Sequence, residues 1–107
     1  MQLVKIDSQA ENDFLIDRGT ADGVFNLNGF ALIGANDQAV PGEWRWADGT
    51  QLWAGDASGS AVNGAFNNWI IGSPSIGGVK NCAGVLLLGT WQDRSCTADV
   101  TSICESP

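Results

Sequence analysis

The stretch NCAGVLLLGTWQDRSC, residues 81–96, contains an apolar run at 85–88, a Gly-Thr turn signal at 89–90 and a second strand-like segment from Trp91. Two short strand segments separated by a turn signal predict a β-hairpin. Cys82 and Cys96 lie at the two ends of this hairpin, so a disulfide could join them. Closing a loop of that size contributes roughly 3 kcal/mol when the bridge is unstrained.

Length and composition predict one domain built from short strands. A chain of 107 residues fits a single domain, residues 1–107, and one this long buries roughly two-thirds of its unfolded surface. The sequence has 14 glycines, five tryptophans, four phenylalanines and only five basic residues. Such a composition favours many turns and short strands over a helical bundle.

The formal net charge of −7 limits the possible partners. The basic residues are scattered, whereas nucleic acids and anionic membrane surfaces are bound by clustered Lys and Arg. No apolar stretch approaches the length of a membrane-spanning helix, so we expect no nucleic-acid partner and no membrane insertion. The acidity is explained by solubility, or alternatively by carboxylates that bind calcium.

The cysteine and histidine counts limit the chemistry. Three cysteines without histidine make a structural zinc site improbable and remove the usual general base of Ser and Cys hydrolases. One disulfide plus one leftover thiol explains three cysteines best. This pattern indicates an oxidising environment, and we expect a secreted or cell-surface protein.

The pattern of polar and apolar residues predicts one helix followed by short strands, an α+β arrangement. The capping box at 8–11 begins the helix, Ala10, Phe14 and Leu15 form its apolar face, and Arg18-Gly19 ends it. An extended lead-in precedes it at 3–6. The expected strands span 30–34, 43–46, 51–53, 83–88, 91–94 and 100–104.

A long irregular loop, about 54–80, is expected between the central and the C-terminal strands. Loops of this length in compact domains are more often functional than accidental. We expect Phe66 and Trp69 to anchor it to the core. Trp44, Trp46 and Trp91 are also expected in the core, whereas Trp53 could be exposed.

Taken in order, several segments are similar to those of C-type lectin-like domains. The resemblance covers essentially the whole chain and implies their α+β fold, with a short helix, small antiparallel sheets and a long irregular loop region. The segments are LVKI to ENDFL (3–15), LIGAND (32–37), WRWADGT (44–50), FNNW and GSPS (66–75), NC (81–82), WQD (91–93), the cysteine at 96, and ICE (103–105).

The chain departs from this family pattern at its N-terminus. The first strand and first helix of the family are missing, and with them the cysteine that normally pairs with Cys104. The resemblance therefore implies a Cys82–Cys96 disulfide and an unpaired thiol at Cys104. A shortened chain explains this, or alternatively a homodimer forms through Cys104 or through the surface left exposed by the missing helix.

A second departure concerns calcium. In sugar-binding members, a Glu-Pro-Asn or Gln-Pro-Asp triplet, a further Glu and a Trp-Asn-Asp motif supply oxygen ligands. Here the triplet is 73–75, Ser-Pro-Ser, Lys80 replaces the Glu, and only Asp93 keeps a carboxylate. Calcium needs six to eight oxygens, so we expect no cofactor at this position. An ion at another site, using Asp37, Asp48 or Asp56, is the alternative.

The same region is the candidate ligand site. Hydroxyl, amide and carboxylate groups can hydrogen-bond the vicinal hydroxyls of a sugar, and the predicted residues are Ser73, Ser75, Lys80, Asn81, Gln92 and Asp93. They could also simply solvate a loop.

We expect a non-enzymatic module that binds carbohydrate without calcium. The alternative is a protein-binding, adhesion or structural module of a larger extracellular protein. A glycosidase pair such as Asp48 with Asp93 is disfavoured, because nothing places the two in one cleft.

Overall fold

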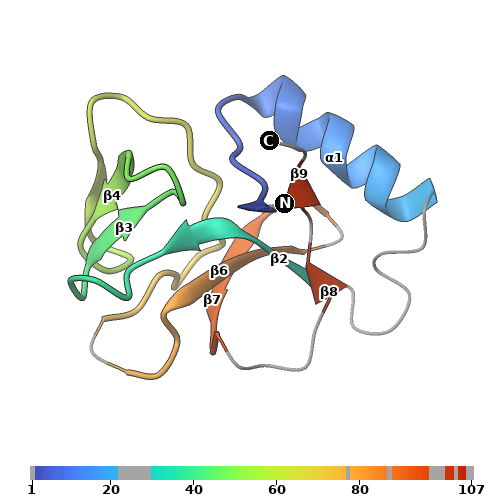
Figure 1. Ribbon diagram of the computed structural model, residues 1–107. Helices are drawn as coiled ribbons and strands as arrows, with labels where there is room; N and C mark the ends of the chain where they lie inside the picture. The colour runs from blue at the N-terminus through green and yellow to red at the C-terminus, as the bar shows by residue number, and fades with distance from the viewer. Residues whose placement is uncertain are drawn as a thin grey trace.

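A computed structural model of the protein describes residues 2–21, 30–76, 78–86, 88–96, 101–102 and 104–105 (Figure 1). These residues form one helix and nine strands. Their bounds are β1 (Gln2–Leu3), α1 (Gln9–Ala21), β2 (Phe30–Asn36), β3 (Glu43–Arg45), β4 (Gln51–Ala54), β5 (Ser60–Ala61), β6 (Cys82–Leu86), β7 (Trp91–Arg94), β8 (Thr101–Ser102) and β9 (Cys104–Glu105).

The main sheet is largely antiparallel. Its strand order is β5-β4-β3-β2-β6-β7, and β8 pairs in parallel with β2. Two of its antiparallel pairs, β3 with β4 and β6 with β7, are the hairpins that the turn signals predicted. A second sheet joins β1 to β9 near the two ends of the chain (Figure 1). The α+β prediction is confirmed.

The two faces of the main sheet carry different side chains. Ala31, Val85 and Trp91 are opposite one another on β2, β6 and β7, and all three belong to the hydrophobic core. Phe30 lies on the other face, where its ring crosses Gly84; a Cβ atom at Gly84 would come within 2.1 Å of that ring. Because successive residues of a strand alternate between faces, this register also fixes where Gln92 and Asp93 point.

Aromatic side chains fill the core between the sheet and the long loop. The Trp91 ring packs edge-on against Trp46, Phe66 and Trp69, with centroid separations of 5.7, 5.6 and 5.9 Å. Trp44 packs in the same manner against Trp69 at 5.0 Å. Edge-to-face contacts of this kind add about 0.5–1.5 kcal/mol each beyond area burial. The predicted anchoring of the loop by Phe66 and Trp69 is confirmed.

The helix differs from the prediction in its end and in its buried face. It continues to Ala21 instead of stopping at Gly19. Phe14 is 60% exposed, whereas Asn12 is buried, donating from Nδ2 to the Gly89 carbonyl and accepting from Trp91 Nε1. A polar residue occupies the buried face because it satisfies two polar groups of the β6–β7 hairpin.

The first turn of the helix forms most of the expected capping box. Ser8 Oγ accepts a hydrogen bond from the Glu11 amide at 3.1 Å. The Glu11 carboxylate accepts from the Asp7 amide, one residue earlier than the Ser8 amide of a standard box.

The strand predictions near the C-terminus were partly correct. β6 begins at Cys82 and ends at Leu86, so the apolar run extends past the strand and Leu88 is 92% exposed. The region 100–104 holds two short strands, β8 and β9, rather than one, and residues 100 and 103 lie outside the described part of the chain. None of the helical residues described here forms a segment long and apolar enough to cross a membrane.

Candidate functional site

The long loop is held along the free edge of β7. Asn68 O accepts from the Trp91 amide, and the Ile70 amide donates to Trp91 O, each at 2.8 Å. The Asn68 side-chain amide donates to the Gly89 carbonyl at 2.6 Å. Apart from β5 and the bridge at Trp69, the described part of the loop is irregular, as predicted. The edge contacts fix the position at which residues 70–76 leave the core.

The Ser-Pro-Ser turn is attached to the sheet by one carboxylate. The Ser73–Pro74 peptide bond is cis. Asp93 Oδ2 accepts hydrogen bonds from both the backbone amide, at 2.9 Å, and the hydroxyl of Ser75. Asp93 is 4% exposed and lies on the core face of β7 beside Trp91. Three of the six predicted site residues, Ser73, Ser75 and Asp93, are therefore brought together.

Two opposing effects set the pKa of Asp93. Burial raises the pKa, but hydrogen bonds from Ser75 and Ser73 stabilise the carboxylate and together leave the pKa below its usual 3.8. The charged form is thus the one that the folded protein favours.

Replacing Asp93 by asparagine is expected to lower the free energy of unfolding at neutral pH by roughly 1.5–3 kcal/mol, the usual contribution of a hydrogen-bonded charged group. Because the pKa of Asp93 is lower in the folded than in the unfolded protein, its contribution is present above pH 3.8 and is lost as the pH falls through the folded pKa. Urea unfolding between pH 2.5 and 7 measures this.

The matched control for this experiment is Asp17→Asn, at an exposed position of α1. The difference between wild type and Asp93→Asn should shrink toward low pH, while Asp17→Asn should track the wild type. A constant difference across this pH range would contradict the charge-stabilised attachment of the turn.

The other three predicted residues do not join this cluster. Gln92 lies on the opposite face of β7 from Asp93, where its Oε1 accepts from Nε and Nη2 of Arg94 at 3.0 and 2.8 Å. Lys80 is exposed before the start of β6. Asn81 is half-buried, and its carbonyl accepts from the Asp37 amide at 3.1 Å.

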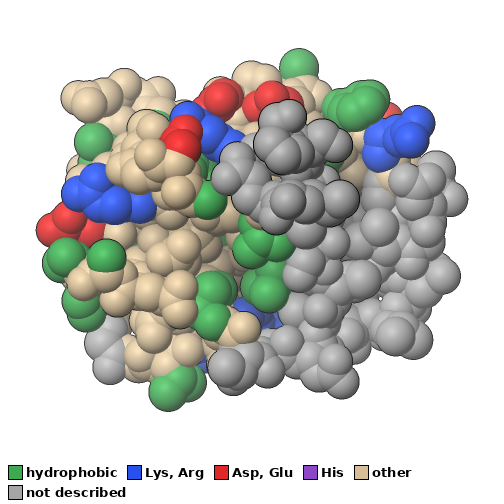
Figure 2. Space-filling model, viewed as in Figure 1, with side chains coloured by type: hydrophobic (Ala, Val, Ile, Leu, Met, Phe, Trp, Pro, Cys, Tyr) green, Lys and Arg blue, Asp and Glu red, His purple; other side chains and the backbone are tan. Residues whose placement is uncertain are grey.

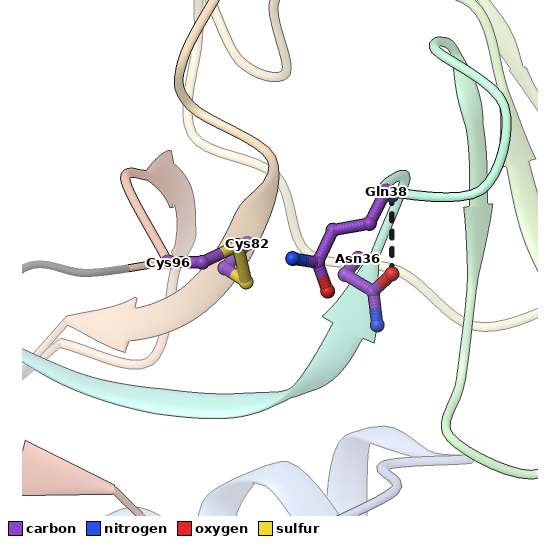
Figure 3. The surroundings of a disulfide bond; sticks show 4 residues. All are labelled: Asn36, Gln38, Cys82 and Cys96. Carbon is purple, nitrogen blue, oxygen red and sulfur yellow. Dashed lines mark hydrogen bonds between the residues drawn. A yellow bond between two sulfur atoms is a disulfide. The ribbon is translucent and has the colours of Figure 1, made fainter.

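A disulfide joins Cys82 to Cys96 at the end of the β6–β7 hairpin, with the two Cα atoms 5.0 Å apart (Figure 3). This pairing confirms what the resemblance implied. The side chain of Cys104 lies outside the described part of the structure, so its free thiol and a covalent dimer stay predictions.

Asp37 is a buried carboxylate that sequence reasoning did not place at the site. It is 2% exposed, its Oδ2 accepts from the Gly42 amide at 2.9 Å, and its Oδ1 has no hydrogen-bond partner. Burial raises the pKa of Asp37, and the nearby Asp93 carboxylate raises it further. The segment LIGAND at 32–37 drew attention to this position, but only the fold shows that it faces inward.

Comparisons with known proteins agree with this architecture. Residues 1–106 match the Lectin C-type domain family. The chain belongs to the C-type lectin family. It is 32% identical over 106 residues to the hepatic lectin of Gallus gallus. The match covers 98% of this lectin domain and 43% of the hepatic lectin.

Solved structures share the fold of this lectin domain. The cow CD23 carbohydrate-recognition domain, solved in the presence of an oligosaccharide, has a TM-score of 0.65 and 28% identity, and the match covers 94% of this chain and 64% of that one. Herring type II antifreeze protein has a TM-score of 0.70 and 23% identity, and the match covers 98% of this chain and 71% of the antifreeze protein. The chain thus spans less than half of the hepatic lectin and about two-thirds of these structures.

The residues of this lectin domain do not fit a calcium-bridged sugar site. Asp93 is the sole carboxylate among the six predicted site residues, and it already binds Ser75. Lys80, which the family resemblance aligns with a Glu ligand, carries a positive charge that repels a divalent cation. Across the described residues, no three His, Cys, Asp or Glu side chains are grouped so that they could hold a metal ion.

The carboxylates considered for a different ion site order their own turns in this lectin domain. Asp48 accepts hydrogen bonds from the Thr50 amide and from Lys5 Nζ. The pKa of Asp48 is lowered to about 2, mainly by the hydrogen bond from Lys5. Asp56 Oδ1 accepts from the Ser58 amide at 2.9 Å. Trp53 is half-buried, and its Nε1 donates to the Asp56 carbonyl. Its indole is therefore held at the start of the loop.

Proposed function

We propose that this lectin domain is a non-enzymatic module that recognises carbohydrate without calcium. Family membership supports a ligand-binding module. The observation that carries the calcium-independent form is the attachment of Ser75 to Asp93. The carboxylate that could contribute to an ion site instead holds the Ser-Pro-Ser turn directly, so the turn needs no ion to be fixed next to β7.

The proposed ligand surface lies at the outer side of this turn and at the adjoining ends of β6 and β7. Asn81 and Lys80 supply an amide and an ammonium group there, whereas Gln92 lies on the opposite face of β7 and can contact only a ligand that reaches around the end of the hairpin. These groups donate and accept in the patterns that pairs of sugar hydroxyls require. Ser73 and Asp93 act behind the surface by holding the turn in place.

A glycan array probed in the presence of 5 mM calcium, and again with excess EDTA, tests this function. We expect at least one glycan to be retained with the same signal under both conditions and to be competed by the free saccharide. Binding that disappears with EDTA would overturn the calcium-independent form, and calorimetric titration with calcium alone should give no heat.

A protein ligand is the second candidate, and exposed apolar side chains favour it. Ile71 is fully exposed and Val79 is 76% exposed on the loop, and Ile76 lies against Gly42 of the neighbouring turn. Apolar side chains reach the surface on the half of the molecule that carries β3, β4 and the loop (Figure 2). A contiguous apolar patch built from such side chains would be typical of a protein contact. An array without any bound glycan would favour this function or a role in adhesion.

We further propose an extracellular location, secreted or at a cell surface, because the Cys82–Cys96 disulfide is stable in oxidising surroundings. A homodimer through Cys104 or through an exposed surface is a further proposal. Catalysis is not proposed, since Asp93 is engaged with Ser75 and Asp48 with Lys5.

A further inference from the structure

We infer that the ligand of this domain carries a negative charge, which Lys80 and Arg94 bind at the disulfide end of the β6–β7 hairpin. The inference rests on the proposed function and narrows its ligand to an acidic saccharide bearing sulfate or carboxylate groups. It follows from the charges, the strand register and the uneven distribution of acidic residues.

The charge argument begins with the partners of the basic residues. Lys5 binds Asp48 at 2.8 Å, and Arg45 binds Glu43 at 2.8 Å. Arg94 instead donates to the neutral Gln92 and lies 4.2 Å from the centre of the Phe30 ring. Within the described part of the chain, neither Arg94 nor Lys80 has a carboxylate partner. No carboxylate among the described residues neutralises these two charges; Lys80 is exposed, whereas Arg94 is half-buried and reaches an external anion only through the part of its guanidinium that Gln92 leaves unbound.

The strand register brings these two cations close to one another. Arg94 is directly opposite Cys82 in the antiparallel β6–β7 pair, and Lys80 precedes Cys82 by two residues. Facing residues lie about 5 Å apart between Cα atoms, and two extended residues span at most about 7 Å. The Cα atoms of Lys80 and Arg94 are thus within about 12 Å. The Arg94 guanidinium is directed along β7 toward Gln92 and the Phe30 ring, away from Lys80, so the two charges bind neighbouring anionic groups of one polyanionic saccharide rather than a single group.

Amide groups surround the same end of the hairpin. Asn36 of β2 is opposite Cys82 on the side away from Arg94, so the three positions form a row across the sheet. Asn36 Oδ1 accepts from the Gln38 backbone amide at 3.1 Å, and the side-chain amide of Gln38 points toward the disulfide (Figure 3). Gln38 is exposed and Asn36 is half-buried. Neutral amides beside two cations are suitable donors for sulfate or carboxylate oxygens.

The segment leading into β6 has no acidic side chains, and the described acidic residues next to it turn away from it in the fold. The segment 70–81 contains no Asp or Glu, although the chain has twelve acidic residues. Asp93 points to the core face, opposite Arg94, and Asp37 is buried. At physiological ionic strength charges are screened beyond about 8 Å. Among the described residues, the cations near the disulfide therefore outweigh more distant acidic side chains for a ligand bound there.

The test compares three polysaccharides of matched length: dextran, dextran sulfate and carboxymethyl dextran. Biolayer interferometry with immobilised domain at 50 mM NaCl should show both anionic polymers binding at least 10-fold more tightly than dextran. The ratio should fall several-fold at 500 mM NaCl, because counterion-dependent contacts weaken with salt. The two anionic arms distinguish sulfate from carboxylate as the preferred group.

Two variants test whether Lys80 causes the preference for anionic polymers. Lys80→Gln should reduce the ratio of anionic to neutral affinity at least 3-fold. Arg18→Gln removes the same charge from an exposed position of α1, at the other end of the molecule from the loop, and should change the ratio less than 1.5-fold (Figure 1). Because Lys80 is exposed, its replacement should leave the thermal midpoint unchanged, which excludes misfolding.

The possible outcomes separate this inference from the proposed function. Equal affinity for all three polymers, or equal losses in the two variants, would overturn the anionic ligand, while neutral glycans retained on the array would still support carbohydrate recognition. A silent array combined with no binding of any dextran would overturn both. A silent array with Lys80-dependent binding of dextran sulfate would keep the anionic ligand and remove neutral sugars as the ligand class.

Discussion

Replacing Trp91 by alanine is expected to lower the free energy of unfolding by about 3–5 kcal/mol. Trp91 is fully buried, and its ring contacts Trp46, Phe66 and Trp69. Removing the indole therefore leaves a cavity at the place where the sheet and the long loop meet. It also leaves Asn12 Oδ1 without its partner, which adds the cost of an unsatisfied buried acceptor.

Urea denaturation followed by circular dichroism at about 218 nm measures this effect, since the backbone dominates the signal there and each variant is fitted with its own baselines. Trp53→Ala is the matched control, because Trp53 is only half-buried and lies at the start of the loop. The control should lose clearly less stability. A loss below 1 kcal/mol for Trp91→Ala would contradict the central position of this ring.

Replacing Cys82 by serine is expected to lower the free energy of unfolding by about 2–5 kcal/mol. The disulfide closes a segment with a sequence separation of 14 and so restricts the unfolded chain. Because the bridge joins the ends of β6 and β7, its loss should also loosen the hairpin next to Arg94. Guanidinium denaturation under non-reducing conditions gives the size of the effect.

A double-mutant cycle provides the control for this prediction. Cys96→Ser should match Cys82→Ser, and the double variant should be no less stable than either single variant, because both remove the same bond. Additive losses, or a denaturation midpoint unchanged by Cys82→Ser, would contradict the pairing.

Local patterns were sufficient to predict most of the main sheet. Trp44 lies in β3 and Trp46 directly follows it, and both indoles are buried on the same side, as expected from the period of two in a strand. The turn signal at Gly89 correctly predicted the β6–β7 hairpin, because the backbone at this position has a positive φ, which glycine adopts readily. These features depend on neighbours in sequence, which is why they could be predicted.

Contacts between distant segments could not be predicted from such patterns. The buried face of the helix follows Asn12, which contacts Gly89 and Trp91, rather than Phe14. The six predicted site residues divide between two faces because Gln92 and Asp93 are adjacent on a strand. Motif reasoning grouped them by sequence proximity, whereas the pleat of β7 separates them.

The pairing of β1 with β9 brings Leu3 opposite Cys104, between α1 and the main sheet and away from the loop of residues 70–76 (Figure 1). A host polypeptide could therefore enter and leave this unit through neighbouring points and carry it as a side branch, without interrupting the host's own path. Copies strung in tandem would project their loops outward from a common spine, an arrangement suited to multivalent capture in which many weak contacts add up.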